Sequence, residues 1–247
     1  MLNHRKLFVL YFFLFIVLFN LNDYIEHQNN SMYFMLNYNN NSVDIFNHLL
    51  FGFANSGNIN LSNVLFQNSY IILIPLFAGQ YISTDLCISG TYYFTRQNNR
   101  TKWYIKKAML LLLFCLIAAA MAVALNIILI KYYDAHIDLL QIFLTTVSLT
   151  FCFYIIAMIS NLLAIFFGIA LSVISSVLII SLNCVIIQYP IRKISMICNS
   201  SILDSDTEFD LAVKLIINFV LAVAAFIVGY ITVKKKEIGL INSEHLF

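Results

Sequence analysis

Apolar and polar stretches alternate along the chain in a pattern that predicts membrane-spanning helices. A helix needs about 20 mostly apolar residues to cross the hydrocarbon core of a bilayer. Six stretches come close to this length or exceed it, at residues 7–21, 64–82, 107–130, 139–160, 162–188 and 211–233. We therefore expect an all-α membrane protein of six transmembrane helices, folded as a single domain over residues 1–247.

The start of the first stretch and the boundary between the fourth and fifth stretches affect the predicted topology. The first stretch follows His4, Arg5 and Lys6, as the apolar core of a signal peptide would, but it is bulky and no small-residue cleavage site follows. We expect it to be a retained helix. Only Ser160 and Asn161 separate the fourth stretch from the fifth, which predicts a tight turn there.

The second stretch is the weakest of the six. Pro75 removes a backbone donor within it and predicts a kink, which neighbouring helices can compensate in a membrane. Its other helix-weakening or polar residues are Gln67, Asn68, Gly79 and Gln80.

The composition agrees with a membrane protein. The chain is 61% hydrophobic and 11% charged, whereas a soluble domain is about 25% charged. The five cysteines show no CxxC spacing, and three lie within apolar stretches, so we interpret them as small core residues.

The basic residues near the ends of the apolar stretches predict the orientation. With the N-terminus in the cytoplasm, ten of the fourteen basic residues fall inside, and six spans also bring the C-terminus inside. These residues are Arg5, Lys6, Arg96, Arg100, Lys102, Lys106, Lys107, Lys234, Lys235 and Lys236. Nine of the twelve acidic residues then lie outside.

Two polar segments are expected on the outer side, at residues 22–63 and 189–210. In the first, apolar residues follow Asp44 at helical spacing, which suggests a short amphipathic helix on the outer membrane surface. They are Phe46, Leu49, Leu50 and Phe53. A loop with local apolar clusters is an equally good interpretation.

No sequence motif indicates catalysis or a resident cofactor. The chain has no phosphate-binding GxxxxGK[ST], no HExxH, no GxSxG and no paired metal-ligand spacing. Ionisable residues inside the apolar stretches are scarce. We expect a non-catalytic protein, with no cofactor or metal of its own, in which the asparagines of the apolar stretches join neighbouring helices. These are Asn126, Asn161, Asn183 and Asn218.

Small residues repeat every fourth position through the predicted fifth helix. The set comprises Ser160, Ala164, Gly168, Ser172 and Ser176. A face of small side chains lets another helix approach closely. It predicts either a subunit interface or packing within the same chain.

The polar segment at residues 85–107 lies between the second and third apolar stretches, on the expected cytoplasmic side. It begins with Asp85, continues through Gly90, Thr91, Tyr92, Tyr93 and Phe94, and ends with Arg96, Arg100, Lys102, Trp103, Lys106 and Lys107. With six spans and no phosphate-binding loop, this segment resembles the membrane subunit of an ABC-2-type (type V-like) exporter. The resemblance covers nearly the whole chain by topology and rests on this one local pattern.

The resemblance implies roles for particular residues. In such permeases this segment docks into a separate ATPase, which makes residues 85–95 a coupling helix and the Ser160–Asn161 turn a second, smaller contact. The basic stretch at Arg100, Lys102, Lys106 and Lys107 would lie at the lipid headgroups, with Trp103 as an interfacial anchor. The outer segment 189–210 resembles a re-entrant segment, and the family pairs two permeases through spans one and five.

The resemblance also implies partners and a location. Two copies of an ABC ATPase would bind ATP and magnesium, and a second permease, identical or homologous, would complete a dimer in the bacterial cytoplasmic membrane. Six residues before the first span and a long, asparagine-rich outer segment are similar to small permeases for peptide export or bacteriocin immunity. The expected substrate is a peptide or another amphipathic molecule, and no nucleic acid is expected. Two alternatives stay open: a membrane sensor or immunity subunit that binds a peptide without transport, and an ATP-independent channel-like oligomer.

Overall fold

The structure is a computed structural model of the whole chain. It describes residues 46–47, 50–51, 64, 68–86, 100–130, 138–186, 195, 197–201 and 208–235. In these parts of the chain all regular structure is helical. The predicted first span, residues 7–21, lies outside the described residues.

Four helices in the described ranges are long and apolar enough to cross a membrane. They are α7 (Arg100–Ile130), α8 (Leu139–Phe167), α9 (Ile169–Ile186) and α10 (Glu208–Lys235). Their lengths and composition indicate a multi-pass membrane protein. They correspond to the third to sixth predicted spans, although α7 already begins at Arg100, inside the predicted cytoplasmic segment.

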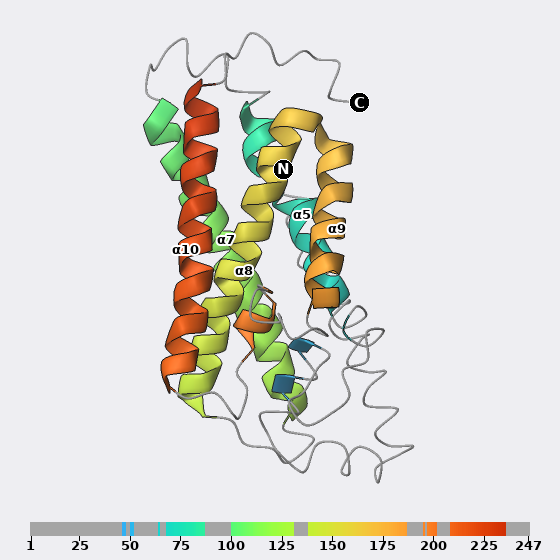
Figure 1. Cartoon of the computed structure of the whole chain (residues 1–247), viewed down its shortest axis with the longest axis vertical. Coiled ribbons are helices and arrows are strands. Elements are labelled where there is room, and N and C mark those ends of the chain that lie inside the picture. Colours follow the sequence, from blue (N-terminus) through green and yellow to red (C-terminus); the bar gives the residue numbers. More distant parts are fainter. Residues whose placement is uncertain are drawn as a thin grey trace.

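The predicted turn at Ser160–Asn161 is wrong. Helix α8 runs through both residues and ends at Phe167, so the predicted spans 139–160 and 162–188 are displaced. The chain turns at Gly168 instead, where φ is 85° and ψ is 170°. Only glycine adopts this backbone conformation readily, because it has no Cβ to clash. Helices α8 and α9 therefore form a hairpin around Gly168 (Figure 1).

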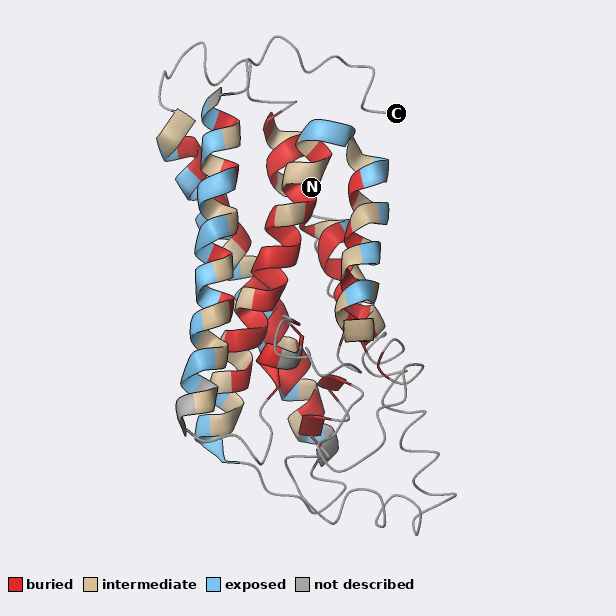
Figure 2. Ribbon diagram, viewed as in Figure 1, coloured by how far each residue is buried: buried red, intermediate tan, exposed pale blue. Residues whose placement is uncertain are grey.

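Helix α8 is the centre of the molecule. It lies between α7 and α10 on one side and α5 and α9 on the other, and it packs against all four (Figure 1). The most apolar part of α8 is 61% buried, against 22% in α9 and in α10. Exposed positions cover the outer faces of α9 and α10 (Figure 2). These faces are apolar, as contact with lipid requires.

The second predicted span is a broken helix. It contains the 3₁₀ helix η1 (Asn68–Ile72) and the short α5 (Leu73–Phe77), then a turn at residues 78–80 and a helical piece at 81–86. The expected irregularity is therefore present, but the main interruption follows α5 and does not fall at Pro75. Irregular backbone is tolerated at membrane depth only where protein or water covers it, and Ala78 and Gly79 are both buried.

The described part of the first outer segment is helical at residues 46–47 and 50–51. Leu50 and Phe51 are fully buried, and the Asn68 Nδ2 donates to the Phe51 carbonyl at 2.6 Å. The described residues are helical, as the amphipathic-helix interpretation predicts, while Leu49 and Phe53 lie outside the described residues. The apolar side chains of Phe46, Leu50 and Phe51 pack into the protein core.

The second outer segment also enters the protein interior. Residues 195, 197 and 199–201 are buried, and the 3₁₀ helix η4 (Cys198–Ser200) packs against α8 and α10. The Ser195 hydroxyl donates to the carbonyl of Asn183 in α9. Three long helices therefore surround this piece of loop.

Candidate functional site

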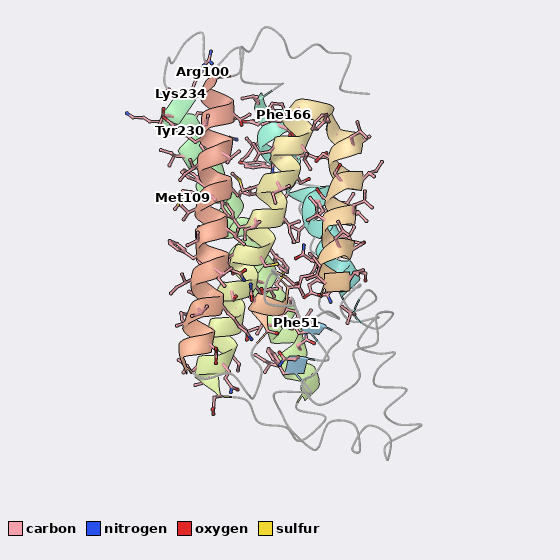
Figure 3. All side chains as sticks on the ribbon, in the orientation of Figure 1. Phe51, Arg100, Met109, Phe166, Tyr230 and Lys234 are labelled. Atoms are coloured by element: carbon pink, nitrogen blue, oxygen red, sulfur yellow. The ribbon has the colours of Figure 1, made fainter. Side chains whose placement is uncertain are left out.

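Basic residues gather at one end of the bundle. Arg100 begins α7 and Lys234 lies near the end of α10, and both project at the same end (Figure 3). Lys102 and Lys106 are exposed along the first turns of α7. The clustering of these cations is the arrangement that the charge pattern of the sequence predicts for the cytoplasmic side.

An ion pair joins the two ends of the predicted coupling segment. The Lys107 Nζ lies 2.9 Å from a carboxylate oxygen of Asp85, and both side chains are about five-sixths buried, at 17% and 16% exposure. The same ammonium donates to the Tyr81 hydroxyl at 3.2 Å and lies 4.8 Å from the centre of that ring. Lys107 thus ties the helical piece 81–86 to the start of α7. Sequence reasoning missed Tyr81, which no local pattern marks.

The predicted coupling residues between these ends lie outside the described residues. They are Gly90, Thr91, Tyr92, Tyr93, Phe94 and Arg96. Their role as a docking surface stays a prediction.

Trp103 does not occupy the position of a lipid-facing anchor. Its side chain is 5% exposed, and the neighbouring Tyr104 is 1% exposed. Tyr104 packs against α10, where its hydroxyl donates to the Phe226 carbonyl at 2.9 Å. A Cβ at Gly229 would clash with that hydroxyl oxygen, so the missing side chain of Gly229 makes room for the tyrosine.

Asn161 fills the break in the second predicted span, between α5 and the helical piece at residues 81–86. Its Nδ2 donates to the Ala78 carbonyl at 2.9 Å, and its Oδ1 accepts from the Ile82 N–H at 2.7 Å. In a continuous helix this N–H would donate to that carbonyl, because the two residues are four apart. The side-chain amide therefore stands between the two partners of a helical hydrogen bond. A predicted turn residue is instead a buried bridge between α8 and a segment about 80 residues earlier.

Ser160 joins three elements beside Asn161. Its Oγ lies 2.9 Å from the Ser172 Oγ, and the Ser172 hydroxyl also donates to the Ser160 carbonyl at 2.6 Å. A Cβ at Gly79 would clash with the Ser160 Oγ. The broken segment, α8 and α9 therefore meet with almost no side chain between them.

The repeat of small residues serves packing within the chain. Ser160 and Ala164 lie on α8, Gly168 forms the turn, and Ser172 and Ser176 lie buried on α9. The sequence predicted that the five residues share one helix face, but they lie on two helices and the turn between them. They line the contact between the two arms of the hairpin. The subunit-interface interpretation does not apply to the serines, which the chain itself covers.

A polar cluster occupies the other end of the bundle. The Asn218 Nδ2 donates to the hydroxyls of Ser148 and Ser200, and the Ser148 hydroxyl donates to the Asn199 carbonyl. The Lys214 ammonium donates to the Ser201 carbonyl at 3.2 Å. The cavity beside this cluster measures about 10 Å³, which is room for about one water molecule. The cluster fixes the buried loop and offers no space for an organic ligand.

The described residues contain no group of three or more His, Cys, Asp or Glu side chains that could hold a metal ion. Cys115, Cys152 and Cys184 are buried thiols without disulfides, which fits packing. No family model, no curated protein and no solved structure matches the chain.

Proposed function

We propose that this chain is the membrane-spanning permease subunit of an ATP-driven exporter of the ABC-2 type. The observation that carries the proposal is the Asp85–Lys107 ion pair at the basic end of the bundle. It joins the two ends of a polar, aromatic segment of the kind that docks a soluble partner. A partner that pushes on a segment moves a bundle only if the segment's ends are fixed to helices, and this pair fixes them.

The interior of the molecule supports the same proposal. The buried residues 195, 197 and 199–201 lie among α8, α9 and α10, as expected for an outer re-entrant segment. The polar contacts at both ends of α8 give the central helix defined partners on each side of the bundle. A displacement of the partners at one end of α8 would therefore be transmitted through this helix to the partners at the other end.

The proposal includes specific partners. Two copies of a separate ATPase would bind ATP and magnesium, and this chain would supply no cofactor and no catalytic group. A second permease, identical or homologous, would complete the complex in a bacterial cytoplasmic membrane. The substrate class is a peptide or another amphipathic molecule. ATP-driven closure of the ATPases would act on the segment at residues 85–95 and change the bundle between two states, which requires different partner contacts in each state.

The decisive experiment is purification of the tagged chain from its own host in mild detergent, followed by identification of bound proteins. We expect a soluble ATPase, and we expect its loss when Thr91–Phe94 are replaced by Gly and Ser. Replacement of Gln97–Asn99 in the same segment is the matched control and should retain the ATPase. An intact complex without any ATPase would overturn the proposal in favour of a peptide sensor or a channel-like oligomer.

A further inference from the structure

We propose that residues 78–83 form a hinge, which Asn161 holds open by taking the place of two helical hydrogen bonds. The geometry points to this because the interruption is narrow. Before it, the Ala78 N–H donates to the Ile74 carbonyl and the Gly79 N–H to the Pro75 carbonyl. After it, the Thr84 N–H donates to the Gln80 carbonyl at 2.9 Å. Between these two positions the Tyr81 N–H donates to the Ala78 carbonyl at 3.2 Å, a bond between residues three apart.

Asn161 hydrogen-bonds to three backbone groups at the interruption. Its Nδ2 binds the carbonyl of Ala78, while its Oδ1 accepts from Ile82 N–H and, at 3.4 Å, from Ser83 N–H. The other N–H of the Asn161 amide donates to the Ala157 carbonyl, one turn earlier in α8. All four hydrogen-bonding positions of the side-chain amide are therefore used. Buried backbone groups without partners are costly, so an open break at this place needs such a side chain.

The same backbone groups have a second possible set of partners. If the Asn161 amide withdraws, the Ile82 N–H can bond to the Ala78 carbonyl and the Ser83 N–H to the Gly79 carbonyl, as in an uninterrupted helix. Both arrangements give the Ala78 carbonyl and the Ile82 and Ser83 N–H groups a partner, which is the property of an element with two discrete states. Insertion of a side chain into the hydrogen-bond ladder is an established cause of sharp helix bends.

The two sides of the hinge are attached to different helices. Helix α5, before the break, packs against α8 and α9. The piece at residues 81–86, after the break, is bound to α7 through Lys107. Breaking and forming the helical hydrogen bonds of the Ile82 and Ser83 N–H groups would therefore move α5 relative to the start of α7.

The test uses the full chain in lipid nanodiscs with Asn161→Ala. Spin labels at Leu76 on α5 and Lys106 on α7, both exposed, report the distance across the hinge. Hydrogen exchange reports the protection of the Ile82 and Ser83 amides. We expect the distance to shift on the order of half a helical turn, about 3 Å, while both amides stay protected. Asn126→Ala is the matched control, because this buried asparagine donates to Ala122 within its own helix. It should change neither reading.

Every other outcome contradicts the proposal that residues 78–83 form a hinge. Faster exchange with an unchanged distance would make Asn161 a static cap on a break that packing fixes. Faster exchange with a changed distance would indicate local unfolding, and no change in either reading would show that Asn161 does not hold the break. Asn161→Leu and Asn161→Asp, which nearly preserve the side-chain volume, repeat the test if the alanine variant folds poorly. No ATPase takes part, so the result is independent of the proposed function.

Discussion

Gly229 on α10 is a single position at which one extra carbon atom decides how two helices pack. A Cβ there would clash with the Tyr104 hydroxyl oxygen and would lie 3.1 Å from the Met158 Cε. We expect Gly229→Ala to lower the free energy of unfolding by about 1–3 kcal/mol, as overpacking does. Thermal unfolding in detergent measures the loss.

A second substitution identifies the cause. Tyr104→Phe removes the clashing oxygen and also the hydrogen bond to the Phe226 carbonyl, so by itself it should cost about 1 kcal/mol. When Tyr104→Phe is already present, Gly229→Ala should then cost less than in the parent chain. Ala224→Val, at an exposed position of the same helix, is the control for added bulk. Equal costs with and without Tyr104→Phe would contradict the proposed contact.

The Asp85–Lys107 pair can be tested by exchanging its charges. Lys107→Met leaves the mostly buried Asp85 carboxylate without this cation. The cost should lie between that of a surface pair and that of a fully buried one, about 1–3 kcal/mol. The double variant Asp85→Lys with Lys107→Asp should recover part of the stability. The single variants Asp85→Lys and Lys107→Asp give the comparison. If the double variant loses as much stability as the two single variants added together, the pair does not act through its charges.

At the scale of elements, the α8–α9 hairpin depends on Gly168. Its φ of 85° with ψ of 170° lies in a region that other residues rarely occupy, and Gly168→Ala should cost about 1–3 kcal/mol. The substitution also favours continuation of α8 into α9, which would separate Ser160 from Ser172.

A cross-link measures this geometry directly. The hydroxyls of Ser160 and Ser172 lie 2.9 Å apart, so the pair Ser160→Cys and Ser172→Cys should form a disulfide under mild oxidation. The link should be weaker when Gly168→Ala is added. The pair Ser160→Cys and Ser176→Cys, one turn further along α9, is the control and should not link. Efficient linkage of the control pair would show that α9 slides along α8.

The positions of the helices agree with the sequence-based prediction in part. Apolar length alone located both ends of α10, the end of α7 and the start of α8 closely, because lipid imposes that length on any spanning helix. It misplaced the α8–α9 turn, since Ser160 and Asn161 are polar residues of the kind found in turns, while Gly168 fitted the repeat of small residues. The deciding fact is that Asn161 bonds to Ala78, far away in sequence. A non-local hydrogen bond leaves no periodic signal, and the same holds for the burial of residues 195, 197 and 199–201.

For the whole molecule, the arrangement of charge predicts which end faces the cytoplasm. Arg100 and Lys234 share one end (Figure 3). Asp138 is the N-cap residue of α8, which begins at the opposite end of the bundle (Figure 1). Cations near span ends are retained on the cytoplasmic side. In intact cells, a membrane-impermeant thiol reagent should label Asp138→Cys and spare Lys102→Cys and Lys234→Cys, all three at exposed positions.

The background for this labelling needs Cys87→Ser and Cys198→Ser, because the other three cysteines are buried. Permeabilised cells supply the control, since there the reagent should reach Lys102→Cys and Lys234→Cys as well. The reversed pattern in intact cells would place residues 85–107 outside, where no ATP-driven partner operates. The exporter proposal would then fail while the helical bundle stood unchanged, because packing within the bundle is the same in either orientation. Sidedness therefore tests the function separately from the fold.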